Sequence, residues 1–116
     1  MTGQILARRH SLCTHGLVAP YMNYLPLLRT VIRATYGCDC VHVKSIRTDA
    51  VSGDVLWRGW VERFHVIDHP GADCAYGWNY RDRRGIQSIV VLGIPGVETA
   101  ADAVRFAFDR AAGVHA

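Results

Sequence analysis

The sequence lacks the features that mark several large classes of protein. Its 116 residues contain four cysteines, which are too few for a secreted disulfide scaffold. The longest apolar stretch falls far short of the roughly 20 residues that a membrane span needs. Residues 17–28 follow Arg8 and Arg9, but proline, asparagine and histidine in and around this stretch interrupt any leader-like apolar run. We therefore expect a cytoplasmic protein with neither a leader nor a membrane segment.

A large excess of charge of one sign is also missing. The formal net charge is +3, and the densest basic group, formed by Arg81, Arg83 and Arg84, is interrupted by Asp82. Nucleic-acid binding that is driven by counterion release needs several basic side chains on one face. The charge pattern therefore does not favour a nucleic acid as the partner.

The signature motifs of common enzymes do not occur. There is no Gly-rich phosphate loop, no Gly-x-Ser-x-Gly and no His-Glu-x-x-His. Glu62, His65, Asp68, His69 and Cys74 are residue types that serve in acid–base or nucleophilic chemistry, but any domain of this size holds such a set. The sequence thus favours a binding protein over an enzyme and implies no cofactor.

The composition is that of one ordinary globular domain. Hydrophobic residues make up 50% of the chain and charged residues 20%. A chain of this length supports one core without disulfide or metal staples and is too short for two. Residues 1–20 mix His, Cys, Gly and Pro without periodicity, so we expect an irregular N-terminal arm followed by a single domain over 21–116.

Apolar spacing predicts a helix near the N-terminus. Between residues 24 and 35 the apolar side chains recur at helical intervals, and Gly37 stands just beyond the end. Asn23 suits the N-cap position, and Pro26 is tolerated in the first turn, where its missing N–H has no partner to lose.

A second helix is expected near the C-terminus. A stripe runs from Val97 to Ala111, and Thr99 with Asp102 resembles a capping box. The alanines of this segment would let the helix lie close to a sheet.

The chain between the helices has the alternation of strands. Four strands are expected, over about residues 41–48, 55–66, 74–81 and 86–94. Turn residues around Gly53 and between 82 and 85 separate the members of each hairpin. Residues 89–92 are all apolar, a pattern typical of a strand buried on both faces, so we expect this strand to be central or covered by a partner.

These elements predict an α+β fold with an N-terminal helix, a four-stranded antiparallel meander sheet and a C-terminal helix packed on one face. We expect both helices to cover the same face of the sheet. The second face would then be exposed, and an apolar face on a domain this small must find something to cover it.

Aromatic side chains at strand spacing are the most distinctive feature. Tyr76, Trp78 and Tyr80 point to one face of a strand because side chains alternate. Trp57 and Trp60 on the neighbouring strand could extend this stripe, and Arg81 follows it. Such rings serve as core, as a dimer interface, as the lining of a small-molecule cleft or as a stacking platform for single-stranded nucleic acid.

Two cysteines and a histidine near the expected first strand are residue types that can bind a metal ion. Cys38, Cys40 and His42 fall on one face of the expected first strand. A straight strand separates alternate side chains by about 6–7 Å, too far for one tetrahedral ion. We therefore expect buried thiols here and no bound metal.

A set of residues spread over the strands and the second helix forms a recognisable pattern: Trp57, Gly59, Val61, Glu62, Phe64, His69, Pro70, Ala72, Tyr76, Trp78, Val91, Leu92, Pro95, Val97, Ala103, Val104 and Arg105. With this pattern, part of the sequence resembles a family of short, uncharacterised proteobacterial proteins of the kind carried on mobile elements such as integron gene cassettes. The likeness covers about residues 41–108, with Gly77 where the family usually has Ala and Gly96 where it often has a second proline. The resemblance supports the strand and helix assignment and implies no activity.

The sequence therefore predicts a small binding or adaptor module that self-associates, as a dimer or larger homo-oligomer, through an apolar sheet face or edge. The alternative is a small-molecule binder or enzyme that uses an aromatic-lined cleft. A second alternative is single-stranded nucleic-acid binding.

Overall fold

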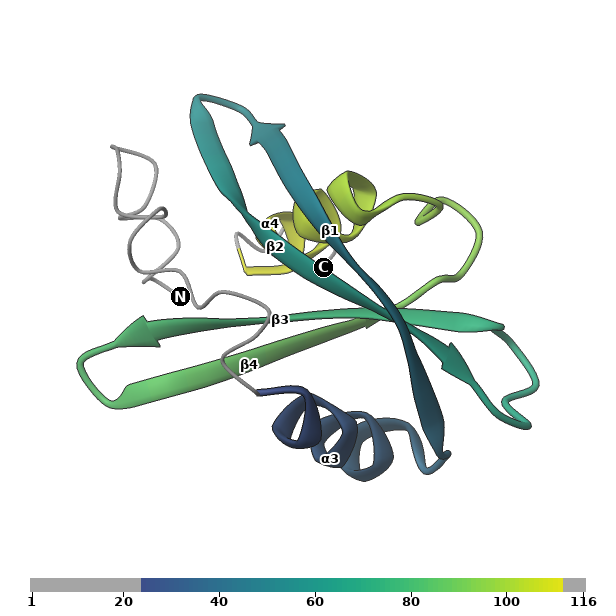
Figure 1. Ribbon diagram of the computed structural model, residues 1–116. Coiled ribbons are helices and arrows are strands. Elements are labelled where there is room, and N and C mark those ends of the chain that lie inside the picture. The colour runs from purple at the N-terminus through teal and green to yellow at the C-terminus, as the bar shows by residue number, and fades with distance from the viewer. Residues whose placement is uncertain (1–23, 112–116) are drawn as a thin grey trace.

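The computed structural model describes residues 24–111, so the expected arm over 1–20 lies outside the described residues. The N-cap of helix α3 (Leu25–Tyr36) is Tyr24, which makes no side-chain cap hydrogen bond, so the expectation that Asn23 caps this helix is wrong. The described chain is α+β, with a four-stranded antiparallel meander and a C-terminal helix packed on one face, as predicted (Figure 1). Its elements are α3 (Leu25–Tyr36), β1 (Cys40–Ser52), β2 (Val55–Val66), β3 (Cys74–Asp82), β4 (Gly85–Leu92) and α4 (Ala100–Ala111).

Helix α3 ends where the sequence places a glycine. Pro26 stands in its first turn, where a proline costs no helical hydrogen bond. Gly37 adopts a φ of 71°, which glycine reaches without strain, and its N–H donates to the carbonyl of Arg33 at 2.9 Å. Leu28 and Ile32, one turn apart, are fully buried as the expected apolar stripe requires, whereas Leu27 of the same stripe is 40% exposed.

The start of α4 is held by the two side chains that the sequence singled out. The Asp102 N–H donates to Thr99 Oγ1 at 3.1 Å, as expected for an N-cap. The Asp102 carboxylate accepts from the N–H of Glu98, one residue before the N–H that a capping box uses. Neither α3 nor α4, the helices of the described residues, has the length and apolarity that a membrane crossing requires.

The four strands pair in chain order, but β2 and β3 meet only briefly. They are joined by four residue pairs, from Glu62 with Gly77 to His65 with Cys74. The β1–β2 and β3–β4 ladders are much longer. Beyond the four pairs the two hairpins diverge, and Figure 1 shows their tips pointing in different directions. The sheet is thus two hairpins joined at a short junction.

The two helices lie on opposite faces of this sheet, so the expectation that both cover one face is wrong. Ala75 of β3 belongs to the core under α3, whereas Tyr76 belongs to the core under α4 (Figure 1). On the α3 side, β3 carries small residues that admit the helix. A Cβ at Gly77 would lie 3.1 Å from Leu28 Cδ2, so α3 approaches the strand closely. Each face therefore has its own helix and its own core.

The apolar run of β4 has a different cause from the one expected. β4 is an edge strand of the sheet and not a central one. Its middle is nevertheless covered on both sides, because Val90 packs in the α3 core and Val91 in the α4 core. The run is explained within one copy of the chain.

A β-bulge interrupts β1 between His42 and Lys44. The extra residue, Val43, changes which residues of the strand point to which face. Cys40, before the bulge, packs in the α3 core, whereas Ala50, after it, packs in the α4 core. Strict alternation would have placed these two even-numbered residues on the same face.

Candidate functional site

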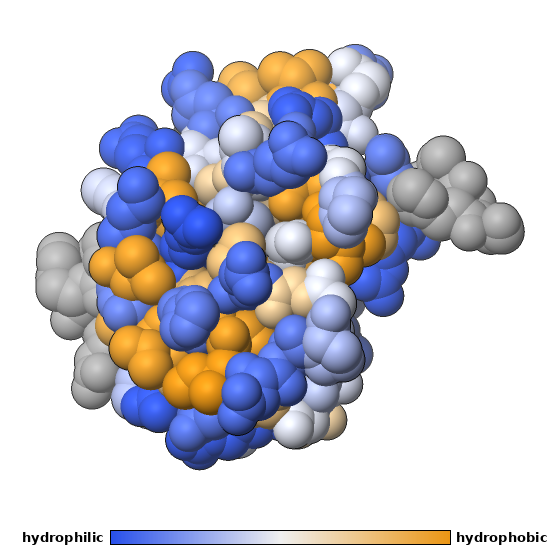
Figure 2. Space-filling model, turned by 90° about the vertical axis from the view of Figure 1, so that its right-hand side faces the viewer, coloured by the Kyte–Doolittle hydropathy of each residue, from blue (hydrophilic) through white to orange (hydrophobic). Residues whose placement is uncertain are grey.

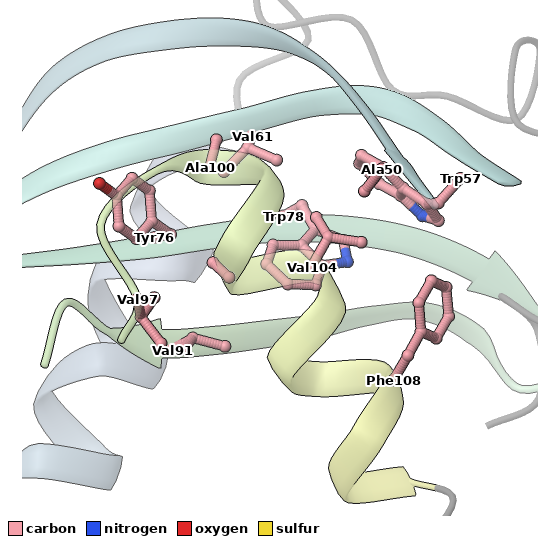
Figure 3. Close-up of a cluster of buried hydrophobic side chains, with 11 residues drawn as sticks. Ala50, Trp57, Val61, Tyr76, Trp78, Val91, Val97, Ala100, Val104 and Phe108 are labelled. Carbon is pink, nitrogen blue, oxygen red and sulfur yellow. The ribbon is translucent and has the colours of Figure 1, made fainter. Parts of the chain in front are cut away.

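Most of the predicted aromatic stripe lies inside the protein. Tyr76 and Trp78 are 3% and 1% exposed beneath α4, and Trp57 joins them at 3% (Figure 3). The Tyr76 hydroxyl donates to the carbonyl of Glu98 at 3.3 Å, and burial raises the pKa of this phenol. These three rings form core with α4, so they present no open aromatic surface.

The remaining members of the predicted site do not join them. Trp60 lies on the α3 side, because residues 57 and 60 of one strand point to opposite faces, and it packs against Arg47, whose Cζ is 5.8 Å from the ring centroid. Tyr80 is half-buried near the end of β3, and burial raises its pKa. Arg81 is exposed beside the β3–β4 turn. The structure therefore divides the predicted site among three places.

A polar cluster that the sequence did not reveal lies on the α3 side of the hairpin β1–β2. The Glu62 carboxylate is 7% exposed, and its Oε1 lies 2.8 Å from His42 Nε2. Ser45 Oγ donates to the same oxygen at 2.5 Å. The bulge at Val43 brings His42 and Ser45 to one face, and the sequence carries no signal for it.

The chemistry of this cluster is that of a satisfied buried carboxylate. Two donors offset the cost of removing Glu62 from water. Ser45 donates to Glu62 and not to His42, so the arrangement differs from a relay in which histidine activates a serine. The cluster therefore stabilises the junction of the sheet and shows no activated nucleophile.

The three side chains considered as metal ligands, those of Cys38, Cys40 and His42, lie at the start of β1 and just before it. Among residues 24–111 no group of three or more His, Cys, Asp or Glu side chains is arranged to hold a metal ion. Cys40 is fully buried in the α3 core, and burial raises the pKa of its thiol. Cys38 precedes β1, and His42 faces Glu62. Cys38 is half-buried and packs against the same α3 core as Cys40, whereas His42 is engaged by Glu62.

Neither outer edge of the sheet, that of β1 or that of β4, pairs with another described strand, and each edge strand packs against a helix. At β4 the Tyr36 hydroxyl of α3 donates to the carbonyl of Val90 at 3.2 Å. Burial raises the pKa of this phenol. No other described strand pairs with the outer edge of β1, which forms the right-hand border of the upper hairpin in Figure 1. β1 has thirteen residues against eight in β4, so its outer edge is the longer one.

Exposed apolar side chains gather on this same strand. Val41, Val43 and Val51 are 52%, 51% and 55% exposed, and Leu56, which pairs with Val51 across the hairpin, is 36% exposed. Figure 2 shows that apolar and charged side chains are interspersed on the side to the right in Figure 1 and do not form one continuous apolar face. The surface of interest is thus an edge and its flanking side chains.

The charged side chains next to this edge already have neighbours within the hairpin. Asp49 Oδ1 lies 3.6 Å from Arg58 Nε, and Arg47 lies over Trp60. All four side chains lie on the α3 side of the sheet. Arg47 and Asp49 both remain exposed on the outer strand.

The chain matches no protein-family model, no curated protein and no solved structure. The resemblance to short proteobacterial proteins over residues 41–108 therefore stays a prediction. On the described surface, the outer edge of β1 combines an unpaired backbone with exposed valines.

Proposed function

We propose that the protein is a small self-associating binding module and that its assembly surface is the outer edge of β1 with the side chains that flank it. One observation carries this proposal. Three of the six large hydrophobic side chains exposed in residues 24–111 lie on β1, the longer of the two edge strands of the sheet. An open edge of this kind is a template for pairing with another strand.

A second copy of the same chain is the occupant to which we commit. Soluble oligomers are mostly symmetric homo-oligomers, and the two-fold dimer is the commonest. β1 is much longer than the usual strand of about five to six residues, so pairing it with a copy of itself would form many backbone hydrogen bonds. Of the two surfaces expected for self-association, a sheet face or a sheet edge, the proposal keeps the edge, because each face is covered by its own helix.

The two alternative functions have lost their main support. A small-molecule cleft and a nucleic-acid platform both depended on Tyr76 and Trp78, which are now placed beneath α4. Arg81 is exposed, but Tyr80 beside it on β3 points to the other face. No arrangement of described residues favours either function over self-association.

Sedimentation equilibrium of the full chain over micromolar concentrations tests the proposal. We expect the mass to rise from 12.9 kDa toward twice that value as concentration increases. Val51→Lys should shift this equilibrium toward monomer, because it places a charge at the edge of β1. Leu27→Lys is the matched control, since Leu27 is 40% exposed on α3 and should leave the equilibrium unchanged. A monomer at every concentration would overturn the proposal.

A further inference from the structure

We propose that β1 pairs antiparallel with β1 of a second copy about a two-fold axis at Thr48, which joins the two sheets into one. This inference rests on the proposed function and goes further, because it fixes the register and the residues in contact. Three features of β1 carry it: the limits of its regular stretch, the direction of its free backbone groups and the order of its charges.

The regular stretch of β1 is bounded on both sides. The bulge at Val43 precedes Lys44, and the turn at Gly53 follows Ser52. Between these limits every residue pairs with β2 without a shift. When a segment pairs with its own copy over its whole length, the two-fold axis must pass through its midpoint. For residues 44–52 that midpoint is Thr48.

The backbone groups of the edge alternate in direction. A two-residue hairpin loop is closed by a pair that exchanges hydrogen bonds, which is Ser52 with Val55 here. Counting back from this pair, the even-numbered residues bond to β2, and the odd-numbered ones turn their N–H and C=O groups outward. Those outward residues are Ser45, Arg47, Asp49 and Val51. A two-fold axis that passes through a residue pairs odd-numbered residues of one copy with odd-numbered residues of the other. The outward N–H and C=O groups of the two strands therefore meet.

The order of charges selects one register among those that this alternation allows. With the axis at Thr48, Arg47 lies opposite the partner's Asp49, and Asp49 lies opposite the partner's Arg47. An axis at Arg47 would oppose two arginines, and an axis at Asp49 would oppose two aspartates. Opposite charges directly across two strands stabilise a pair, and like charges destabilise it. Only the central register gives two favourable pairs.

The other face of the strand is the one that α4 covers, and Thr48 and Ala50 are only 5% and 2% exposed within one copy. Their contacts with a second copy would therefore form beside the core under α4, with Thr48 next to the partner's Thr48 and Ile46 next to the partner's Ala50. Threonine pairs and small or β-branched side chains suit neighbouring strands. The charge complementarity and the bounded length thus agree on a second copy as the occupant.

Charge exchange tests the register directly. Arg47→Asp and Asp49→Arg should each raise the dimer dissociation constant at least about tenfold, because each puts like charges opposite one another twice. An equimolar mixture of these two single variants should form a heterodimer, and the double variant Arg47→Asp with Asp49→Arg should restore the homodimer. Sedimentation velocity measures each case.

Arg58→Gln is the control for the intrachain contact of Asp49. It removes the Asp49–Arg58 pair but changes nothing on the outer edge, so the dissociation constant should stay within about twofold of the unmodified chain. If Arg58→Gln weakens the dimer as much as the single charge exchanges do, the proposed contact of Arg47 with the partner's Asp49 is wrong.

A cross-link gives a second readout that does not depend on charge. The two Thr48 Cα atoms would be about 4.5 Å apart in a non-hydrogen-bonded pair, which a disulfide can span. Thr48→Cys should form a covalent dimer on mild oxidation, whereas the unmodified chain and Val51→Cys should not. A dimer that ignores the charge exchanges and gives no Thr48→Cys cross-link overturns this register and leaves self-association standing. A monomer at all concentrations overturns both.

Discussion

The indole rings of Trp57 and Trp78 meet across the gap between the two hairpins, with their centroids 5.7 Å apart and their planes inclined by 57°. Trp57 belongs to β2 and Trp78 to β3, at positions where these strands no longer pair. The contact therefore replaces the backbone ladder that is missing there, and α4 closes over it (Figure 3).

Trp78→Ala should lower the free energy of unfolding by about 3–5 kcal/mol, because a large side chain that is 1% exposed would leave a cavity between the hairpins. Urea denaturation followed by circular dichroism measures the loss. Trp60→Ala is the matched control: its half-buried ring packs with Arg47 on the other face, so about 1 kcal/mol should be lost. Equal losses in the two variants would show that Trp78 does not join the hairpins.

Glu62→Ala should cost about 1–3 kcal/mol of unfolding free energy, because Ser45 and His42 lose the carboxylate that they face. Glu62→Gln keeps the shape and an acceptor oxygen, so its cost should be smaller. The exposed Glu98 provides the comparison, and Glu98→Ala should change stability by less than about 0.5 kcal/mol. A neutral effect of Glu62→Ala in the same denaturation experiment would contradict the role of this cluster.

Asp102 should make the stability of α4 depend on pH in the acid range. Hydrogen bonds from the Glu98 N–H and from Arg105 hold the pKa of this carboxyl below its ordinary value. A carboxyl whose folded pKa is lowered stabilises the fold above its unfolded pKa, and the contribution is lost as the pH falls through the folded pKa.

The comparison of the unmodified chain with Asp102→Asn isolates this contribution. The difference in unfolding free energy should be largest near neutral pH and should shrink below about pH 4. Thermal unfolding at a series of pH values measures it. A difference that stays constant from neutral to acid pH would mean that ionised Asp102 contributes nothing to the helix.

Local features of the fold could be predicted because they depend on neighbouring residues. Gly37 ends α3, and Gly53 lies in the turn between β1 and β2. Both positions adopt a positive φ that glycine tolerates. Thr99 caps α4 for an equally local reason, the reach of its hydroxyl to a nearby N–H. The element order follows from the same kind of signal, a change of apolar period between helix and strand.

Features that depend on contacts between distant segments could not be predicted in this way. The periodicity of α3 and α4 shows that each has a buried side, but it does not say which face of the sheet that side meets. The bulge at Val43 leaves no mark in the alternation, so the grouping of His42, Ser45 and Glu62 was hidden. The separation of Trp57 from Trp60, in contrast, could have been predicted. The two residues are three positions apart on one strand, so their rings must point to opposite faces of the sheet.

The junction of only four residue pairs between β2 and β3 has a consequence for how the chain folds. Each hairpin closes between segments that are neighbours in the sequence, so it can form early and at little cost in loop entropy. We therefore expect the docking of the two hairpins, together with α4, to be the slow step. We expect substitutions at Trp57 or Trp78 to accelerate unfolding more than they retard refolding, which stopped-flow fluorescence can measure.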